Sequence, residues 1–93
     1  MNAKAKGSRN ERRTMRYLEA LGYACTRAAA SLGIFDVVAV GPRDVKLLQV
    51  KSNRWPGSVE MEAIELFACP SFVSKEVWRW NDHARQPVVK VIG

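Results

Sequence analysis

The sequence predicts one α/β domain of the α+β kind, spanning residues 1–93, in which two helices flank a central mixed sheet. Three features predict this class: an amphipathic segment near the N-terminus, short apolar runs separated by turn residues, and a second amphipathic segment between the third and fourth runs. The expected order is therefore α-β-β-β-α-β-β. A chain of 93 residues with 47% apolar composition supports one hydrophobic core, and pairing with a second copy would help so small a domain to cover its apolar surface.

The first helix is predicted to begin at Ser8 or Asn10, which are both favourable N-cap residues, and to end near Leu21. Gly22 follows directly, as is common at the end of a helix. Residues 1–8 are polar and basic, and we expect them to form a flexible basic arm ahead of the helix.

One face of this helix carries an acidic residue in line with apolar ones. Met15, Leu18 and Leu21 form the predicted buried face, and Glu11 lies on the same stripe. Because ionised groups are rarely buried without a partner, an inward-facing Glu11 indicates a functional carboxylate. The alternative is an exposed acid in the first turn, where it interacts favourably with the helix dipole.

Positive charge is concentrated near the N-terminus. The chain has a net charge of +6, and residues 1–16 hold six basic residues against one acidic residue, Glu11. The basic residues are Lys4, Lys6, Arg9, Arg12, Arg13 and Arg16. A basic arm that leads into a helix is a common footprint of nucleic-acid binding, whereas the alternative is a solvated face that keeps the protein soluble.

The next elements are predicted to be a strand and a β-hairpin. Residues 23–30 favour a strand, and the small residues 29–33 favour a loop that permits close approach of a backbone or ligand. Residues 34–52 are predicted to form two antiparallel strands around the turn 41–44, which reads Gly-Pro-Arg-Asp.

This turn fixes which residues face each other in the hairpin. Val40 pairs with Val45, and counting outward places Asp36 opposite Gln49. Side chains alternate between the faces of a strand, so Lys51 projects on the same side as Gln49. An acid, an amide oxygen and a lysine are therefore expected at one end of the hairpin.

The second half of the chain is predicted to hold one helix and two strands. Residues 52–58 are rich in turn formers and connect the hairpin to a helix over 59–68, which Pro70 ends. Residues 74–80 and 87–92 are predicted to be strands joined by a polar turn. The helix is expected to turn an apolar face to the core, formed by Met61, Ile64 and Phe67. Its acidic residues are expected to face mostly outward: Glu60, Glu62 and Glu65.

The aromatic residues of this half suggest a core or a dimer contact. Trp78 and Trp80 share one face of their strand, which favours burial over a platform for stacked bases. We expect a symmetric dimer contact that buries Trp78, Trp80, Phe72 and Phe67. His83 is predicted to be a surface residue in the polar turn.

The residues at the end of the hairpin suit a divalent metal that cuts a phosphodiester. Mg²⁺, for which Mn²⁺ commonly substitutes, prefers oxygen ligands, and Asp36, the amide of Gln49 and the backbone carbonyl of Val50 offer them. Lys51 would act as a positive charge near the phosphate, and Glu11 would bind a metal-bound water or a second ion. The alternatives are an Asp36 paired with Lys51 or Arg27, and a Lys51 that guards a strand edge.

These residues carry a family resemblance. A helix Glu, a hairpin Asp and a (Glu/Gln)-x-Lys triplet resemble the PD-(D/E)XK nuclease superfamily, and RNERRTMRYLEALGY, TRAAAS, FDVVAV and LLQVKS are similar to archaeal-type and phage Holliday junction resolvases. The resemblance covers residues 7–68 well. It implies a restriction-endonuclease-like fold and a metal-dependent endonuclease, usually homodimeric, that nicks paired strands of branched DNA.

The resemblance also assigns site residues. Glu11, Asp36, Gln49 and Lys51 match the catalytic positions, and Ser31 matches a loop serine. Two positions depart from the pattern: Phe35 replaces the proline usual before the acid, and Gln49 replaces the more common acid, which lowers the expected metal affinity. The residues expected to bind DNA are Lys6, Arg9, Arg12, Arg13, Arg27, Ser31, Ser52 and Arg54.

The sequence therefore predicts a Mg²⁺-dependent endonuclease for branched DNA, with two alternatives. One is a more general structure-selective or nicking nuclease of the same superfamily. The other is a DNA-binding module that has lost cleavage, with Gln49 in place of the acid. Cys25 and Cys69 lack the spacing of a metal site and are expected to be reduced, as in a prokaryotic, archaeal or phage-encoded protein of the cytoplasm. No apolar run suggests a signal peptide or membrane span.

Overall fold

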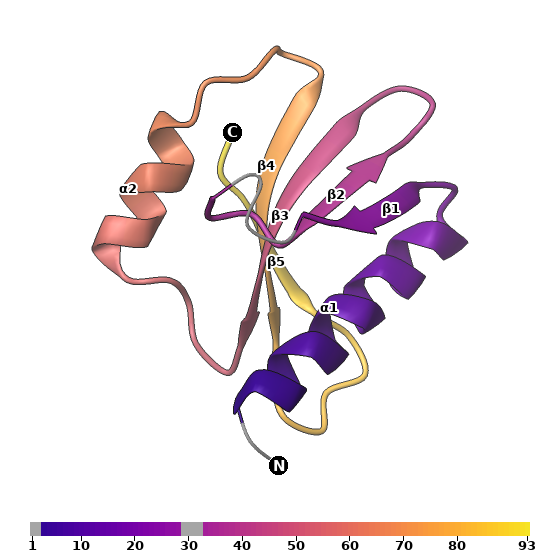
Figure 1. The fold of residues 1–93 in the computed structure, drawn as a ribbon, viewed down its shortest axis with the longest axis vertical. Coiled ribbons are helices and arrows are strands. Elements are labelled where there is room, and N and C mark those ends of the chain that lie inside the picture. Colours follow the sequence, from indigo (N-terminus) through magenta and orange to yellow (C-terminus); the bar gives the residue numbers. More distant parts are fainter. Residues whose placement is uncertain (1–2, 29–32) are drawn as a thin grey trace.

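The computed structural model describes residues 3–28 and 33–93, and it confirms the predicted order of elements. The helices are α1 (Ala3–Ala20) and α2 (Ser58–Leu66). The strands are β1 (Ala24–Arg27), β2 (Val37–Val40), β3 (Val45–Ser52), β4 (Val73–Trp80) and β5 (Val88–Val91). The two helices lie on opposite sides of the strands, as Figure 1 shows.

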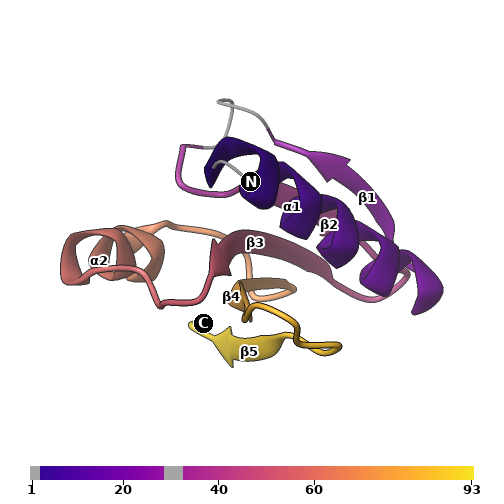
Figure 2. The ribbon, with the colours of Figure 1, turned by 90° about the horizontal axis from the view of Figure 1, so that it is seen from below.

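The five strands form one mixed sheet in the order β1-β2-β3-β4-β5. Neighbouring strands are antiparallel except β3 and β4, which run parallel. A parallel pair needs a crossover connection, and α2 provides it. The sheet extends from β1 at one edge to β5 at the other (Figure 2).

The hairpin register is the one that the sequence predicts. Val40 pairs with Val45 and Val37 with Leu48, and the Gly41 N–H donates to the carbonyl of Asp44 at 2.8 Å. A side chain at position 41 would meet the ring of Tyr23 at 2.7 Å, so the turn requires glycine for close packing. The four-residue turn thus fixes the position of every residue on the paired strands.

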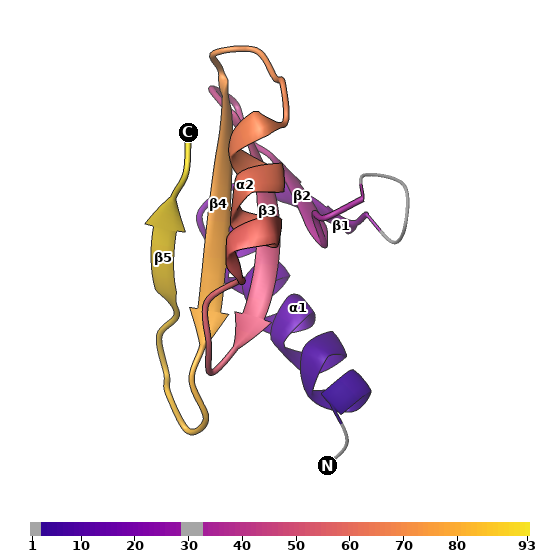
Figure 3. The same ribbon diagram turned by 90° about the vertical axis from the view of Figure 1, so that its left-hand side faces the viewer.

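Two clusters of buried side chains lie on the two faces of the sheet. Leu18 of α1 packs on the first face, and Ile64 of α2 packs on the second; both are fully buried. The α1 cluster also contains Val37, Ala39, Leu48, Trp78 and Trp80. The α2 cluster contains Phe35, Leu47 and Val77 besides Ile64. Figure 3 shows α2 in front of β3 and β4, with β5 as the outer strand.

Helix α1 differs from its prediction at both ends. It begins at Ala3, so residues 3–8, which were expected to precede the helix as an arm, are helical, while residues 1–2 lie outside the described residues. Alanine and lysine are good helix formers, and the Lys6 ammonium reaches the Asp82 carboxylate at 3.0 Å. Leu21 is 63% exposed rather than buried, because the helix has already ended and Leu21 lies in the turn.

A buried set of hydrogen bonds, here called the α1 polar chain, joins α1 to the sheet. The Asn10 side-chain amide donates to Ser52 Oγ at 2.7 Å, and Thr14 Oγ1 donates to the backbone carbonyl of Asn10 at 2.8 Å. The Trp80 indole donates to Thr14 Oγ1 at 2.8 Å. Asn10 and Thr14 are 3% and 0% exposed, so each bond satisfies a polar group that water cannot reach.

The structure corrects the prediction of a dimer contact through the tryptophans. Trp78 and Trp80 are each 3% exposed because α1 covers their face of the sheet, so neither is available to a partner. Phe67 packs edge-on against Phe35, with 5.0 Å between the ring centres. Phe72 is 56% exposed and is the aromatic residue of this group that remains on the surface.

Cys25 and Cys69 are both free thiols. His83 is exposed, as predicted, and has a positive φ of 65° in the turn between β4 and β5. None of the helices formed by residues 3–28 and 33–93 combines the length and apolar character that crossing a membrane requires.

Lys75 on β4 stabilises the C-terminal end of α2. It is 7% exposed, and its ammonium donates to the backbone carbonyls of Ile64, Glu65 and Phe67 at 2.8, 2.9 and 2.9 Å. The last carbonyls of a helix have no partner within the helix, and this side chain satisfies those of Glu65 and of the C-cap residue Phe67. It is a second donor to the Ile64 carbonyl, which also accepts from the Phe67 N–H at 3.2 Å.

We predict that Lys75→Met lowers the free energy of unfolding by about 2–4 kcal/mol, because it removes the ammonium from the Glu65 and Phe67 carbonyls, while the Ile64 carbonyl keeps the Phe67 N–H. Urea denaturation measures the change. Lys90→Met, on the exposed strand β5, is the control and should shift stability by less than about 0.5 kcal/mol. Equal losses in the two variants would contradict a capping role for Lys75.

Candidate active site

Asp36 lies immediately before β2, at the end of the hairpin that faces away from the turn. Its backbone N–H donates to the Leu48 carbonyl at 2.8 Å, and its carbonyl accepts from the Ala28 N–H at 2.9 Å. Because Val37 is already paired with Leu48, the bond from the Asp36 N–H places both residues opposite Leu48, and this β-bulge replaces the predicted pairing of Asp36 with Gln49. Phe35 accordingly packs in the α2 cluster beside Val38, and not on the face of Val37. The carboxylate oxygen Oδ2 accepts a hydrogen bond from the Val50 N–H at 2.8 Å, which fixes the direction of the side chain.

The surroundings of Asp36 raise the pKa of its carboxyl group above the ordinary value. Burial is the largest cause, and the negative charges of Glu11 and Glu60 act in the same direction. The Val50 N–H and the positive charge of Lys51 oppose it. Asp36 thus lies where negative charge accumulates, and a cation would relieve this repulsion.

Gln49 is 6% exposed and has one side-chain atom with no partner. Its Nε2 donates to the Ile34 carbonyl at 3.3 Å and to Glu60 Oε2 at 3.1 Å. Its Oε1 is buried and accepts no hydrogen bond within the part of the chain that the structure describes. A buried amide oxygen without a donor is costly, and a bound metal ion would satisfy it.

The Val50 carbonyl and the Lys51 side chain lie at the same end of β3. The N–H and C=O of a strand residue point to the same side, and the Val50 N–H faces Asp36, so the Val50 carbonyl faces the space that β2 leaves open. Lys51 shares its face of β3 with Gln49, and its neighbour on β4 is Arg79. Among residues 3–28 and 33–93, no carboxylate lies within 4.0 Å of the Lys51 ammonium.

Glu11 faces the sheet, as predicted, but binds a cationic side chain. Arg27 Nη2 lies 2.7 Å from Glu11 Oε1, Arg27 Nε donates to the same oxygen at 3.0 Å, and Arg27 Nη2 also reaches Ser8 Oγ at 3.3 Å. The Glu11 side chain is 20% exposed. It lies near enough to Asp36 for its charge to raise the pKa of that carboxyl, so it belongs to the margin of the site.

These residues fit a hard metal ion with few protein ligands. The described part of the chain contains no group of three His, Cys, Asp or Glu side chains that could hold a metal. The candidate ligands are instead one carboxylate, one amide oxygen and one backbone carbonyl, from Asp36, Gln49 and Val50. This donor set is hard and carries little charge, which suits Mg²⁺ because that ion keeps several of its own waters.

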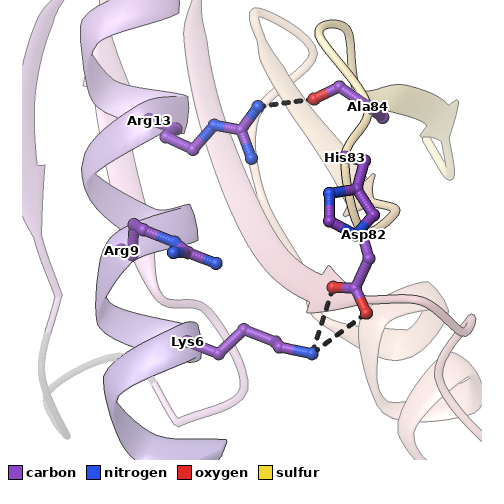
Figure 4. A pocket seen from close by; sticks show the side chains of 6 residues that line it. All are labelled: Lys6, Arg9, Arg13, Asp82, His83 and Ala84. Carbon is purple, nitrogen blue, oxygen red and sulfur yellow. Dashed lines mark hydrogen bonds and ion pairs between the residues drawn. The ribbon is translucent and has the colours of Figure 1, made fainter. Parts of the chain in front are cut away.

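The residues predicted to bind DNA are not brought together in one place. Lys6, Arg9 and Arg13 of α1 line an open pocket of about 570 Å³ together with Asp82, His83 and Ala84 of the β4–β5 turn (Figure 4). Lys6 is paired with Asp82, and Arg13 donates to the Ala84 carbonyl at 2.7 Å and lies 4.1 Å from the centre of the Trp80 ring. Arg9 is exposed.

The other predicted DNA contacts have varied surroundings. Arg12 and Arg54 are exposed, whereas Arg27 is paired with Glu11. Ser52 belongs to the α1 polar chain, so its hydroxyl is already engaged by Asn10. Ser31 lies outside the described residues.

Sequence reasoning missed Glu60. It was expected to face solvent from α2, and the residue is exposed as a whole, yet its carboxylate accepts the Gln49 amide. The signal in the sequence was weak: Glu60 is the acidic residue in the first turn of the helix that directly follows β3.

Comparisons with known proteins identify the family. The sequence profile of the archaeal Holliday junction resolvase (Hjc) family matches residues 2–74. The structure is similar to a 1.6 Å structure of Hjc from Archaeoglobus fulgidus, a Holliday junction resolvase from an archaeal hyperthermophile, with a TM-score of 0.76. The sequence identity is 24%, over 94% of this chain and 73% of that chain. No curated protein sequence matches. The chain belongs to the archaeal Holliday junction resolvase family, a family of junction-resolving nucleases.

Proposed function

We propose that this protein is a Mg²⁺-dependent endonuclease that cuts four-way DNA junctions as a homodimer. The observation that carries the metal site is the buried amide oxygen of Gln49, which has no partner among the described residues and lies one residue before Val50, whose N–H holds the Asp36 carboxylate. The positive charge of Lys51 on the same face favours phosphodiester chemistry over a purely structural cation.

Each residue has a role in this proposal. Asp36, the Gln49 Oε1 and the Val50 carbonyl would hold the ion, which would supply the charge that activates water and stabilises the developing negative charge on the phosphate. Lys51 places its ammonium near the phosphate and neutralises charge in the transition state. Glu11, held in place by Arg27, would orient a water at the margin of the site.

The proposed DNA contacts lie on α1 and around the site. Arg9, which is exposed and lines the pocket in Figure 4, is well placed to neutralise a phosphate. The other proposed contacts are Lys6, Arg12 and Arg13 of α1, and Arg27, Ser31, Ser52 and Arg54. Junction DNA as substrate and two free thiols also fit a reducing intracellular compartment.

We predict that Arg9→Ala weakens junction binding about 3–10-fold at low salt, and that it lowers the slope of log K against log salt by about 0.9 for one lost phosphate contact. Fluorescence anisotropy over a salt series, in EDTA to prevent cleavage, measures both values. Arg43→Ala, on the exposed hairpin turn, is the matched control. A change of the same size in both variants would mean that net charge, rather than this position, determines affinity.

The homodimer is proposed because the single chain leaves apolar side chains uncovered. With Trp78 and Trp80 buried, the exposed apolar residues of the outer strand are Val88, Val89 and Val91, which are 39%, 41% and 63% exposed. A symmetric pair would present two metal sites to two DNA strands, as paired nicking of a two-fold junction requires. Analytical ultracentrifugation at micromolar concentration gives the test, and a monomer would remove the dimer from the proposal.

One cleavage experiment tests the proposed activity. The protein is incubated with Mg²⁺ or Mn²⁺ and with end-labelled linear, flap and four-way DNA. Paired nicks confined to the four-way DNA would support junction resolution. Cuts in several substrates would support a general nicking nuclease, and binding without cuts would support a DNA-binding module that has lost cleavage.

A further inference from the structure

Glu60 touches the candidate metal site although it belongs to neither the hairpin nor α1. It lies in the first turn of α2, and its Oε2 is 3.1 Å from the Gln49 Nε2. Within residues 3–28 and 33–93, no lysine, arginine or histidine lies within 4.0 Å of its carboxylate. Its negative charge is therefore not neutralised by an ion pair.

The contacts of Gln49 determine which way its amide points. Nε2 faces the Ile34 carbonyl at 3.3 Å and the Glu60 carboxylate, and both of these groups can accept hydrogen bonds but not donate them. If the amide were turned over, Oε1 would face two acceptors and would be repelled. Glu60 and Ile34 thus hold Oε1 on the other side, where it is buried without a partner.

The charge of Glu60 also matters because Gln49 is the position at which this chain departs from the nuclease motif. Gln49 stands where an acid is more common, so the site lacks one negative charge. Glu60 brings a carboxylate into hydrogen-bond contact with that same residue. Glu60 of α2 thus supplies a negative charge next to Gln49, and Gln49 lies between that charge and the proposed metal ion.

We propose that Glu60 is a positioning residue that orients Gln49 toward the metal ion and restores the negative charge that an acid at position 49 would have supplied. This inference rests on the proposed metal site. Partners that orient metal ligands are typically worth about 10–100-fold in metal affinity, so the effect is large enough to measure.

The first test measures metal binding without DNA and without cleavage. Mn²⁺ is titrated into the wild type, Glu60→Ala, Glu60→Gln and Glu62→Ala, and the unbound ion is followed by electron paramagnetic resonance. Glu60→Ala should weaken binding about 10-fold or more. Glu60→Gln keeps an acceptor for the amide and loses the charge, so it should fall between Glu60→Ala and the wild type. Glu62, exposed on the same helix, is the matched control and should bind as the wild type does.

The second test exchanges the two side chains. Gln49→Glu alone would place two carboxylates about 3 Å apart, so the metal-free variant should melt at a lower temperature than the wild type. The double variant Gln49→Glu/Glu60→Gln restores one amide and one carboxylate in reversed positions. It should recover the melting temperature and bind Mn²⁺ at least as tightly as the wild type, because the carboxylate then ligates directly.

These measurements separate the inference from the proposed function. Circular dichroism first establishes that each variant is folded. If the wild type binds Mn²⁺ and cuts junctions while Glu60→Ala binds Mn²⁺ equally well, Glu60 has no role at the site and the inference is wrong. It is equally wrong if the exchanged double variant binds no better than Glu60→Gln. If Glu60→Ala weakens Mn²⁺ binding but the wild type cuts no DNA, the inference holds and the nuclease proposal fails.

Discussion

Asp36→Asn should lose cleavage of four-way DNA by about 10³-fold or more, because it removes the one carboxylate that accepts from the Val50 N–H and faces the candidate metal position. Asparagine has nearly the same shape and can accept the same hydrogen bond, so the fold should be intact. Junction binding in EDTA should stay within about twofold of the wild type, since affinity comes from phosphate contacts elsewhere. Single-turnover cleavage with excess protein measures the chemical step directly.

The same substitution should leave the metal-free protein as stable or more stable. Burial, and then Glu11 and Glu60, raise the pKa of Asp36 in the folded state, so its ionised form is less favourable there than in the unfolded chain. This cost is present above the folded pKa and disappears as the pH falls through it. The melting temperature of Asp36→Asn should therefore exceed that of the wild type by up to about 5 °C at neutral pH, with a smaller difference in acid.

Asp44→Asn provides the control for a carboxylate outside the site. Asp44 accepts from the Tyr23 hydroxyl at 2.7 Å in the hairpin turn, at the opposite end of β2 from Asp36. This variant should cut junctions at the wild-type rate. If Asp36→Asn were also to cut at the wild-type rate, the assignment of the site would be wrong. If Asp36→Asn lost stability as well as activity, its defect would be one of folding.

Lys51→Ala should reduce the cleavage rate by about 10²–10⁴-fold and should leave metal binding largely unchanged. Lys51 shares its face of β3 with Gln49 and has no carboxylate partner among the residues that the structure describes, so its charge is available to a phosphate. Removing it takes away stabilisation of the transition state rather than a ligand. The expected result is a lower single-turnover rate with an unchanged Mn²⁺ titration.

Two further variants make the Lys51 result specific. Lys90→Ala removes the same unit of charge from the exposed strand β5, and its rate should match the wild type. Lys51→Arg keeps the charge but changes its shape and reach, so it should recover part of the rate. A Lys51→Ala variant that lost Mn²⁺ binding and rate in parallel would indicate a structural role for Lys51 and not a catalytic one.

The hairpin was the part of the fold and site that the sequence could specify most closely. Its turn has four residues, and side chains on paired strands alternate strictly, so the position of the turn determines the pairs from Val40–Val45 to Val37–Leu48. The bulge at Asp36, whose N–H bonds to Leu48, could not be predicted from this alternation. The inward position of Glu11 followed in the same way from helical periodicity. Hairpin register and helical periodicity can be predicted in this way because they depend only on residues close together in the sequence.

The features that the sequence could not specify all depend on distant contacts. Ser8 and Asn10 suggested a late start for α1, yet the helix extends back to Ala3, and Lys6 pairs with Asp82, 76 residues away. Periodicity predicted that Ile64 and Phe67 face the core, but it also predicted this for Met61, which does not belong to the α2 cluster. It did not predict that the first turn of α2 lies beside β3, where Glu60 accepts a hydrogen bond from Gln49. The burial of the tryptophans likewise depends on the path of α1 across the sheet.

The α1 polar chain has a consequence for exchanging parts between resolvases. A slide of α1 by one residue would move it about 1.5 Å and turn it about 100°, which would break the bonds of Asn10 and Thr14 and carry Glu11 away from Arg27. The position of Glu11 is therefore set by hydrogen bonds on a different side of the helix. A chimaera that receives α1 from a relative will keep an aligned Glu11 if the side chains at positions 52 and 80 are transferred with it.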